Sequence, residues 1–237
     1  MKTEKFALFK SLIAFLAILG CLWAMQWQFA RGVDRQQENA VIAQRLELKP
    51  RPLAEIQGDV SAYEWSTVTT KGYFQPNNQI LLRNRYFEGQ YGFEVLTRFE
   101  SEDGRKFWVD RGWVKAGKNA STPPTTTTVP KESVEITARL RLDSSLPQGA
   151  FFAMPSSKNG GLVRKLNAQS GLSSENFYLD LISASDTDIN PAAPAQLPEL
   201  SDGPHMAYAV QWLFFAGLIL YGRVLIRRSE ILSVKEL

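Results

Sequence analysis

The chain has 237 residues, with 27 basic and 24 acidic side chains, one histidine and one cysteine. A lone cysteine excludes an intrachain disulfide. With a single histidine, the chain cannot form a multi-histidine zinc site, and a catalytic triad could use only His205 as its base. The sequence shows no glycine-rich phosphate loop and no basic patch for nucleic acid. We therefore expect a binding or assembly role rather than an enzyme, although glycosidase-type chemistry by a carboxylate pair stays open.

Two apolar segments set the class of the protein. Ser11–Trp27 and Met206–Gly222 carry no charge and have 17 residues each, which is at the short end of what crosses a membrane core of roughly 30 Å. We predict transmembrane helices over residues 11–29 and 205–226. Aromatic side chains suited to the membrane interface occur in both segments: Trp23, Trp27, Tyr208, Trp212 and Tyr221.

The N-terminal segment also resembles two kinds of export signal. Lysines before an apolar run are typical of a signal peptide, and Ile18–Cys21 resembles a lipoprotein processing site. Cleavage before Cys21 would leave the apolar Leu22–Met25 as the new terminus, where a polar tether is expected. An uncleaved anchor is therefore favoured, and lipidation of Cys21 stays open.

The charge distribution predicts the orientation. The N-terminal tail, residues 1–10, has three basic residues against one acidic, and the C-terminal tail beyond Gly222 has four against two. The section between them, residues 31–205, has 20 basic and 21 acidic residues. The excess of positive charge in the tails places both termini in the cytoplasm, in tails 1–10 and 227–237, and residues 30–204 outside the cell membrane.

The section outside begins with a helix and continues as strands. Asp34–Leu48 has no glycine or proline, so we expect it to extend the first helix until Pro50 and Pro52 end it. Turn signals at Gln75–Asn78, Glu88–Gln90 and Glu102–Gly104 separate the runs that follow. Those strand-like runs are Trp65–Phe74, Gln79–Tyr86, Tyr91–Phe99, Lys106–Arg111 and Val134–Leu142.

The later part of this section predicts one short helix and one more strand. The helix carries Leu162, Val163 and Leu166 and is closed by Gly171, and the strand covers Phe177–Ile182. Residues 117–130 and 186–204 are rich in polar residues and proline, and we predict a loop and a flexible linker there. The expected fold class is an α+β membrane protein with two terminal transmembrane helices flanking an antiparallel β-barrel or sandwich with minor helices.

Several side chains have ordinary structural interpretations. His205 is at the entry to an apolar helix, where a lone histidine is usually an interfacial polar residue. Cys21 fits a small apolar side chain against a neighbouring helix. In Arg111-Gly112-Trp113, we expect the glycine to turn the chain, the tryptophan to lie in the core and the arginine to pair with a carboxylate.

The order of several short motifs resembles a known family. Trp27–Arg31 reads W-Q-F-A-R at the end of the first apolar segment, Val109–Val114 reads V-D-R-G-W-V, and His205–Trp212 reads H-M-A-Y-A-V-Q-W. Together with Gly72–Phe74, Gly92–Thr97 and Asp103–Arg105, they resemble the Surfeit locus protein 1 family of cytochrome c oxidase assembly factors. The chain departs from the family pattern at Gly203-Pro204, where asparagines often precede the histidine, at Lys115, where a proline is common, and at Ala24-Met25, where Leu-Gly is usual.

The resemblance implies a role in building haem-copper cytochrome c oxidase, assisting the insertion of haem a into the catalytic subunit. His205 then corresponds to the candidate axial ligand of the haem iron, with Trp27, Tyr208 and Trp212 against the macrocycle and Arg31 on a propionate. The expected partners are the catalytic subunit of the oxidase, the haem a synthesis machinery and membrane lipid. Arg111 and Trp113 are candidates for docking the oxidase subunit.

Two other functions stay open. The chain could be an anchored docking or scaffold module that braces a membrane complex without binding haem, or an envelope-binding domain unrelated to oxidases. One histidine cannot supply both axial ligands of a haem iron. The second ligand would be water, Met25, Met206, a second copy of the chain or a partner subunit.

Overall fold

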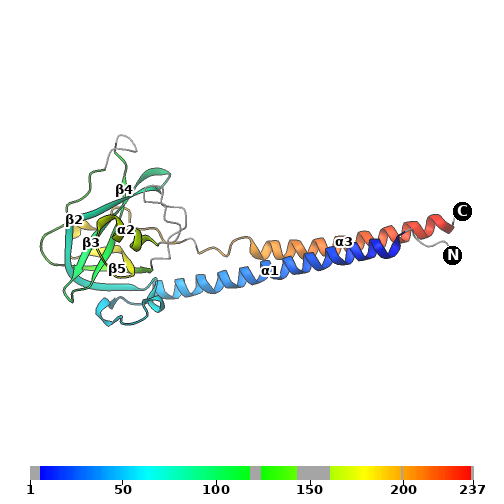
Figure 1. Ribbon diagram of the computed structural model, residues 1–237, viewed down its shortest axis with the longest axis horizontal. Coiled ribbons are helices and arrows are strands. Elements are labelled where there is room, and N and C mark those ends of the chain that lie inside the picture. The colour runs from blue at the N-terminus through cyan, green and yellow to red at the C-terminus, as the bar shows by residue number, and fades with distance from the viewer. Residues whose placement is uncertain (1–5, 118–123, 143–160, 199, 236–237) are drawn as a thin grey trace. The chain divides into compact units, whose positions relative to one another are not determined.

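The computed structural model describes residues 6–117, 124–142, 161–198 and 200–235. The chain divides into two compact units, one made of residues 1–43 and 199–237 and the other of residues 44–198. The first unit holds the two long helices and the second holds the β-sheet (Figure 1).

The first unit is a pair of long apolar helices. Helix α1 runs from Ala7 to Glu47 without a break, which confirms that Asp34–Leu48 extends the first apolar segment. Helix α3 runs from His205 to Lys235. By length and composition, α1 and the His205–Ser229 part of α3 are long and apolar enough to cross a membrane.

Small residues let the two helices approach each other. Cys21 and Gly32 on α1, and Ala209 and Ala216 on α3, are the residues of these two helices that lose most of their exposure, apart from the polar Asn39. A Cβ atom on Gly32 would lie 3.0 Å from Cε of Met206. Small residues at such contacts are typical of helices that pack within lipid, where close backbone approach supplies the packing energy.

Large apolar side chains cover the remaining surface of both helices. Phe15 and Leu16 on α1 are 57% exposed, and Leu213 and Phe214 on α3 are 53% and 63% exposed. Near the start of α1, the Arg223 guanidinium of α3 donates hydrogen bonds to the hydroxyl of Ser11, the shortest at 2.9 Å. An arginine within an apolar helix is thereby given a polar partner on the neighbouring helix.

The second unit is a closed β-barrel. Its strands are β1 (Arg51–Pro52), β2 (Thr67–Phe87), β3 (Gln90–Ser101), β4 (Lys106–Lys115), β5 (Val134–Leu142) and β6 (Phe177–Ala184). The sheet order is β1-β2-β3-β4-β6-β5, and pairing of β2 with β5 closes it. The predicted α+β fold class is confirmed, and of the two predicted architectures the barrel is the one observed (Figure 1).

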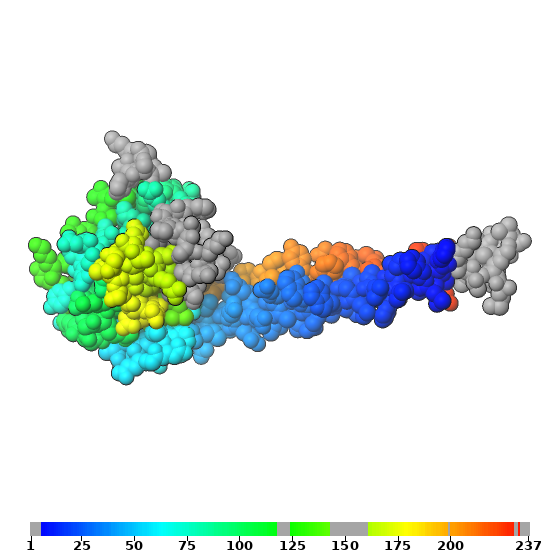
Figure 2. All heavy atoms as spheres, in the orientation of Figure 1, coloured from blue at the N-terminus to red at the C-terminus, as the bar shows by residue number. Residues whose placement is uncertain are grey.

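Alternate side chains of the strands fill two hydrophobic clusters. Inside the barrel the rings of Phe99, Phe107 and Phe177 stack in sequence, with centroids 5.5 and 5.6 Å apart. On the outer face, helix α2 (Leu162–Ser170) packs its apolar side chains over Leu96 and Trp108. Figure 2 shows α2 in yellow-green on the surface of the domain. The predicted short helix and its closing glycine are confirmed, because Gly171 adopts the left-handed conformation at its end.

The turn predicted at Gln75–Asn78 is wrong. Gln75 pairs with Arg98 and Gln79 with Thr97, so the three residues from Pro76 to Asn78 form a bulge inside one long strand, β2. Proline lacks the N–H that the ladder needs, which suits it to a bulge as well as to a turn. The adjacent turn at Glu88-Gly89 is confirmed as a hairpin, with both residues at positive φ.

Successive strands with short connections pair antiparallel, as expected, in β2–β3 and β3–β4. Two other pairs are parallel. Strand β4 pairs with β6 in parallel, and the short β1 pairs with β2 in parallel. Strand β6 is not joined to β4 by a short turn. It lies between β4 and β5 in the sheet, and it pairs antiparallel with β5 and parallel with β4.

The predicted linker at 186–204 is partly folded onto the barrel. Residues Thr187–Ile189 form a short 3-10 helix, with Ile189 in the core. The Trp113 backbone N–H donates to the Ala193 carbonyl at 2.8 Å, so the chain after β6 returns along β4. Its alanines and prolines suit a close extended contact as well as a free linker. The loop predicted at 117–130 falls partly outside the described residues, and its described part, 124–130, has no helix or strand.

Candidate functional site

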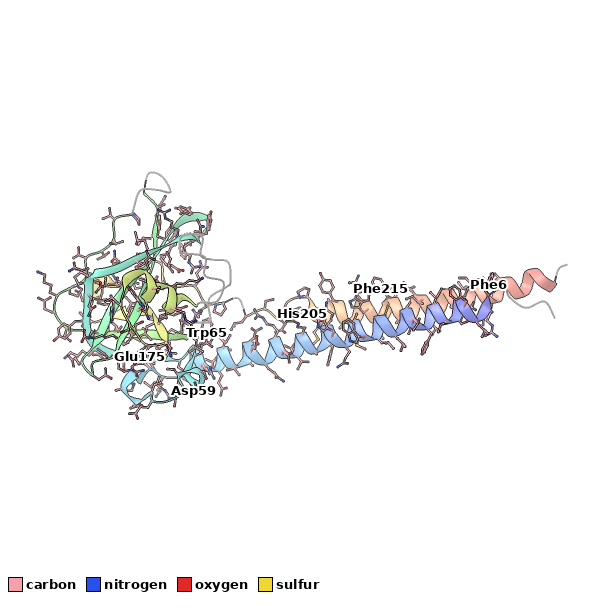
Figure 3. All side chains as sticks on the ribbon, viewed as in Figure 1. Phe6, Asp59, Trp65, Glu175, His205 and Phe215 are labelled. Atoms are coloured by element: carbon pink, nitrogen blue, oxygen red, sulfur yellow. The ribbon has the colours of Figure 1, made fainter. Side chains whose placement is uncertain are left out.

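His205 is the first residue of α3 (Figure 3), and a side chain of α1 is hydrogen-bonded to its ring. The Nδ1 atom of His205 lies 2.9 Å from Oε1 of Gln28. An amide oxygen only accepts hydrogen bonds, so this contact places the ring proton on Nδ1. In the neutral imidazole the lone pair is then on Nε2, the nitrogen that can bind a metal ion.

Gly203 lies beside the Nε2 edge of the His205 ring. Gly203 has a positive φ of 65°, and a Cβ atom there would lie 3.5 Å from Cδ2 and 3.8 Å from Nε2 of the imidazole. A longer side chain at this position would extend along the same edge of the ring. At Gly203, where the family pattern differs, the chain thus carries no side chain beside this edge of the imidazole.

A polar clasp connects this segment to α1. The carboxylate of Asp202 accepts one hydrogen bond from Nε2 of Gln36 at 3.0 Å and another from Nδ2 of Asn39 at 3.3 Å. Asn39 is buried although it lies on a helix with much exposed surface. The clasp holds the chain three residues before His205, so the imidazole is positioned by α1 on two sides.

A cleft of about 550 Å³ opens beside His205. Its walls come from α1 and from the segment before α3: Arg31, Asp34, Arg35, Glu38, Ser201, Asp202, Gly203 and His205. Arg35 is paired with Glu38 at 3.6 Å, and both are exposed. Among the described residues Arg31 has no carboxylate partner within 4.0 Å, and its guanidinium lies over the Trp27 ring at 5.3 Å from the centroid. Arg31 is thus a cation held at the cleft by an aromatic face.

The aromatic candidates lie on both helices. Trp27 and Tyr208 are 47% and 46% exposed, so each presents much of its ring. Tyr208 and Trp212 follow His205 by three and seven residues, which places all three on one side of α3. The structure therefore brings His205 and Arg31 to one cleft, with Trp27 against Arg31 and the other two rings further along the same side of α3.

The methionines named as possible second ligands have different settings. Met206 packs against the backbone at Gly32, with its sulfur 3.1 Å from where a Cβ atom would stand. That contact commits the Met206 side chain to helix packing. Met25 is half-buried on α1.

Cys21 is buried on α1 where the helices pack, as expected for a small side chain at that contact. Within the described part of the chain, no group of three or more histidine, cysteine or carboxylate side chains is placed to hold a metal ion.

Arg111 and Trp113 lie in the barrel, on β4. Arg111 is 7% exposed and donates to the Thr127 carbonyl at 2.7 Å and to Oε1 of Gln79 at 3.2 Å. The expected carboxylate partner is therefore wrong, because neutral oxygens from a bulged strand and a loop reach the guanidinium instead. Burial lowers the pKa of Arg111 to about 10. Trp113 is half-buried and donates its indole N–H to the Arg85 carbonyl at 3.2 Å, so it is not a full core residue. Docking through these two residues stays a prediction.

The sequence motifs assign no role to four residues that make hydrogen bonds at the site: Gln28, Gln36, Asn39 and Asp202. Gln28 stands inside the W-Q-F-A-R motif, which was the available signal, but its partner is 177 residues away in the chain. Asn39 is in a region of α1 with many polar residues, so nothing marked it as buried.

Comparison with known protein families matches residues 13–217 to the SURF1 family. An uncharacterized SURF1-like protein of Mycobacterium bovis is 32% identical, over 86% of this chain and 79% of its own length. An uncharacterized SURF1-like protein of Mycobacterium tuberculosis matches with the same identity and coverage. A SURF1-like protein of Dictyostelium discoideum is 32% identical over 31% of this chain and 25% of its own.

Proposed function

Because the chain belongs to the SURF1 family, which is linked to cytochrome oxidase assembly, we propose that it is an assembly factor that helps haem a reach the catalytic subunit of a haem-copper oxidase. The observation that carries this proposal is the setting of His205. One ring nitrogen is engaged by Gln28, and the residue lines an open cleft. A histidine oriented in this way by a neighbouring acceptor is the usual arrangement of an iron or zinc ligand.

The residues present fit a haem group. His205 would hold the iron through Nε2, and Arg31 would pair with a propionate, since its guanidinium has no carboxylate partner among the described residues. The exposed rings of Trp27 and Tyr208 would offer apolar surface to the macrocycle. When bound, haem a would supply an iron centre that accepts one imidazole nitrogen from this chain.

The cleft supplies one protein ligand, and this suits transfer. With a single histidine in the chain, the described residues offer no second imidazole to the same iron. Ligation from one side is weaker than ligation from two, so the cofactor is released more easily to an acceptor. The remaining position is left to water, to Met25, to a second copy or to the partner subunit.

The proposal places the protein in the cell membrane with both termini in the cytoplasm. Exposed apolar side chains along α1 and α3 support contact with lipid, because such a surface is costly in water. The positive tails support the orientation. The barrel would then lie outside, available to the oxidase subunit and to the haem a synthesis machinery.

A second candidate function is docking without haem. The observation that favours it is the aromatic end of the β2–β3 hairpin, where Tyr86 is 63% exposed and its ring lies against Tyr91 at 5.6 Å. Exposed tyrosines are common at protein interfaces. In this case the barrel would brace an oxidase subunit or another membrane complex, and His205 would be an interfacial side chain.

Absorbance separates the two functions. The full chain is purified in detergent from cells that make haem a, and its Soret band is compared with that of His205→Ala. Haem in the wild type and its loss in the variant support the ligand role. Wild-type protein free of haem, or an unchanged band in the variant, contradicts it. If deletion of the gene also leaves oxidase activity intact, the assembly role itself is refuted.

A further inference from the structure

A second cavity, of about 320 Å³, lies against the outer wall of the barrel. Strands β2, β3, β4, β5 and β6 contribute its polar floor, and residues 194–198 contribute one side. It shares no residue with the cleft at His205. Its volume is at the small end of ligand pockets, which suits one side chain or a ligand of similar size.

The floor of this cavity carries charges that form two closed pairs. Arg85 is bound to Glu94 at 2.7 Å. Arg141 is bound to Asp180 at 2.8 Å, and Arg139 approaches the same carboxylate at 3.9 Å. Buried pairs of this kind need both members in place, because a lone buried charge is costly. Each guanidinium on the floor therefore already has a carboxylate.

Asp110 is the carboxylate that remains. It is 4% exposed and lies directly across the parallel ladder from Asp180. One of its oxygens accepts the Gly112 backbone N–H at 2.9 Å. Among the described residues its other oxygen has no hydrogen bond and no cation within 4.0 Å, although the residue lines the cavity. Burial, with the nearby carboxylates of Glu94 and Asp180, raises the pKa of Asp110 well above its usual range. A cation bound beside Asp110 would lower that pKa again and stabilise the charged carboxylate.

Aromatic rings form much of the remaining wall. Trp65, Trp113 and Tyr178 line the cavity, together with Tyr86 and Phe87. The guanidinium of Arg141 already stacks over Trp65, 3.7 Å from the ring centroid. Faces of indole and phenol rings attract cations, most strongly where water is excluded. A carboxylate that shares a cavity with such rings is the combination that recognises an organic cation.

We propose that this cavity binds an organic cation, a guanidinium or ammonium group on a short apolar stem, with Asp110 as its carboxylate partner. Charge complementarity selects the occupant: Arg85 is paired with Glu94, Arg141 and Arg139 both lie at Asp180, and Asp110 has no cation within 4.0 Å among the described residues. The most direct source of such a group is an arginine or lysine side chain of a protein that docks on the barrel. This site is independent of haem and of the function proposed for His205.

The test uses the full wild-type chain in nonionic detergent, titrated by calorimetry with small probes at pH 7.5. The probes are Nα-acetyl-arginine amide, Nα-acetyl-lysine amide and the neutral isostere Nα-acetyl-citrulline amide. At least one cationic probe is expected to bind at least tenfold more tightly than citrulline amide. Equal binding of charged and neutral probes, or no binding of any, overturns the proposal without recourse to a variant.

Two variants locate the site and separate it from the haem cleft. Asp110→Asn keeps an oxygen for the Gly112 N–H and removes the charge, so the cationic probe is expected to bind at least tenfold more weakly. His205→Ala is expected to leave binding unchanged, which keeps failure of this proposal distinct from failure of the haem proposal. Unchanged binding to a folded Asp110→Asn, judged by circular dichroism, overturns the assignment. Methylguanidinium is the probe for the guanidinium group alone. If Nα-acetyl-arginine amide binds more tightly than methylguanidinium, an arginine side chain as the natural occupant is supported. If the two bind equally, the side-chain source is overturned in favour of a free cation.

Discussion

Gln28 gives the sharpest test of the arrangement at His205. The Gln28 side chain accepts one hydrogen bond from Nδ1 of His205 at 2.9 Å, in a partly buried setting. Gln28→Leu removes the acceptor and keeps a side chain of similar size. We expect the variant to fold, because no other hydrogen bond of the Gln28 side chain occurs among the described residues.

The expected magnitude follows from this single bond. A neutral hydrogen bond contributes about 0.5–1.5 kcal/mol, and about 1.4 kcal/mol corresponds to a tenfold change in affinity. Outer partners of metal-bound histidines are worth roughly 10–100-fold in affinity. Because the contact is only partly buried, we expect haem to bind about tenfold more weakly to Gln28→Leu. Gln28→Glu offers a charged acceptor, which binds the ring N–H more strongly, so its affinity should equal or exceed that of the wild type.

The assay is a haem titration of purified apoprotein, followed at the Soret band. Gln26→Leu is the matched control, since it makes the same change at another position of α1 that carries none of the site's contacts. The reasoning is refuted if Gln28→Leu binds haem as tightly as the wild type and the control. A loss in Gln28→Glu as large as that in Gln28→Leu would also contradict the role of an acceptor.

Two further predictions concern the barrel. Asp110 has a raised pKa, so its favourable contribution to the free energy of unfolding is present below about pH 4 and is lost as the pH rises through the raised pKa. Asp110→Asn should therefore gain stability relative to the wild type between pH 4 and pH 8, in urea unfolding followed by circular dichroism, and a constant difference would contradict this. Gly112 has a φ of 89°, and a Cβ atom there would lie 2.5 Å from a backbone carbonyl oxygen, whereas Gly104 has a φ of 84° and open space. Gly112→Ala should cost about 1–3 kcal/mol more than Gly104→Ala, which isolates the steric contact from backbone strain, and equal losses would show that the contact relaxes.

Local patterns were sufficient to predict most elements of this protein. The apolar runs and their bounding charges predicted two terminal helices, and Pro50 and Pro52 marked the end of the first. Val134–Leu142 was predicted with both ends correct. These elements depend on residues that are near each other in the sequence, because the hydrophobic period identifies a helix or strand and proline and glycine mark its ends.

The errors arose where distant segments compete for the same backbone groups. The Pro76 region became a bulge because β3 continues past it on the other side of the ladder. Ile189, which lies in the predicted linker, packs its side chain into the barrel core. Arg111 donates hydrogen bonds to neutral oxygens of Gln79 and Thr127, and no sequence spacing indicates that these residues lie beside it.

The sequence by itself therefore determined the class of the chain, its two apolar helices, its β-rich middle and the motif that contains His205. Only the tertiary structure decided that Gln28 holds one nitrogen of that histidine and that Asp110 lies buried beside two complete ion pairs. The reason is physical: a hydrophobic period is set by neighbours a few residues apart, whereas a hydrogen bond or a charge pair depends on which distant backbones folding brings together.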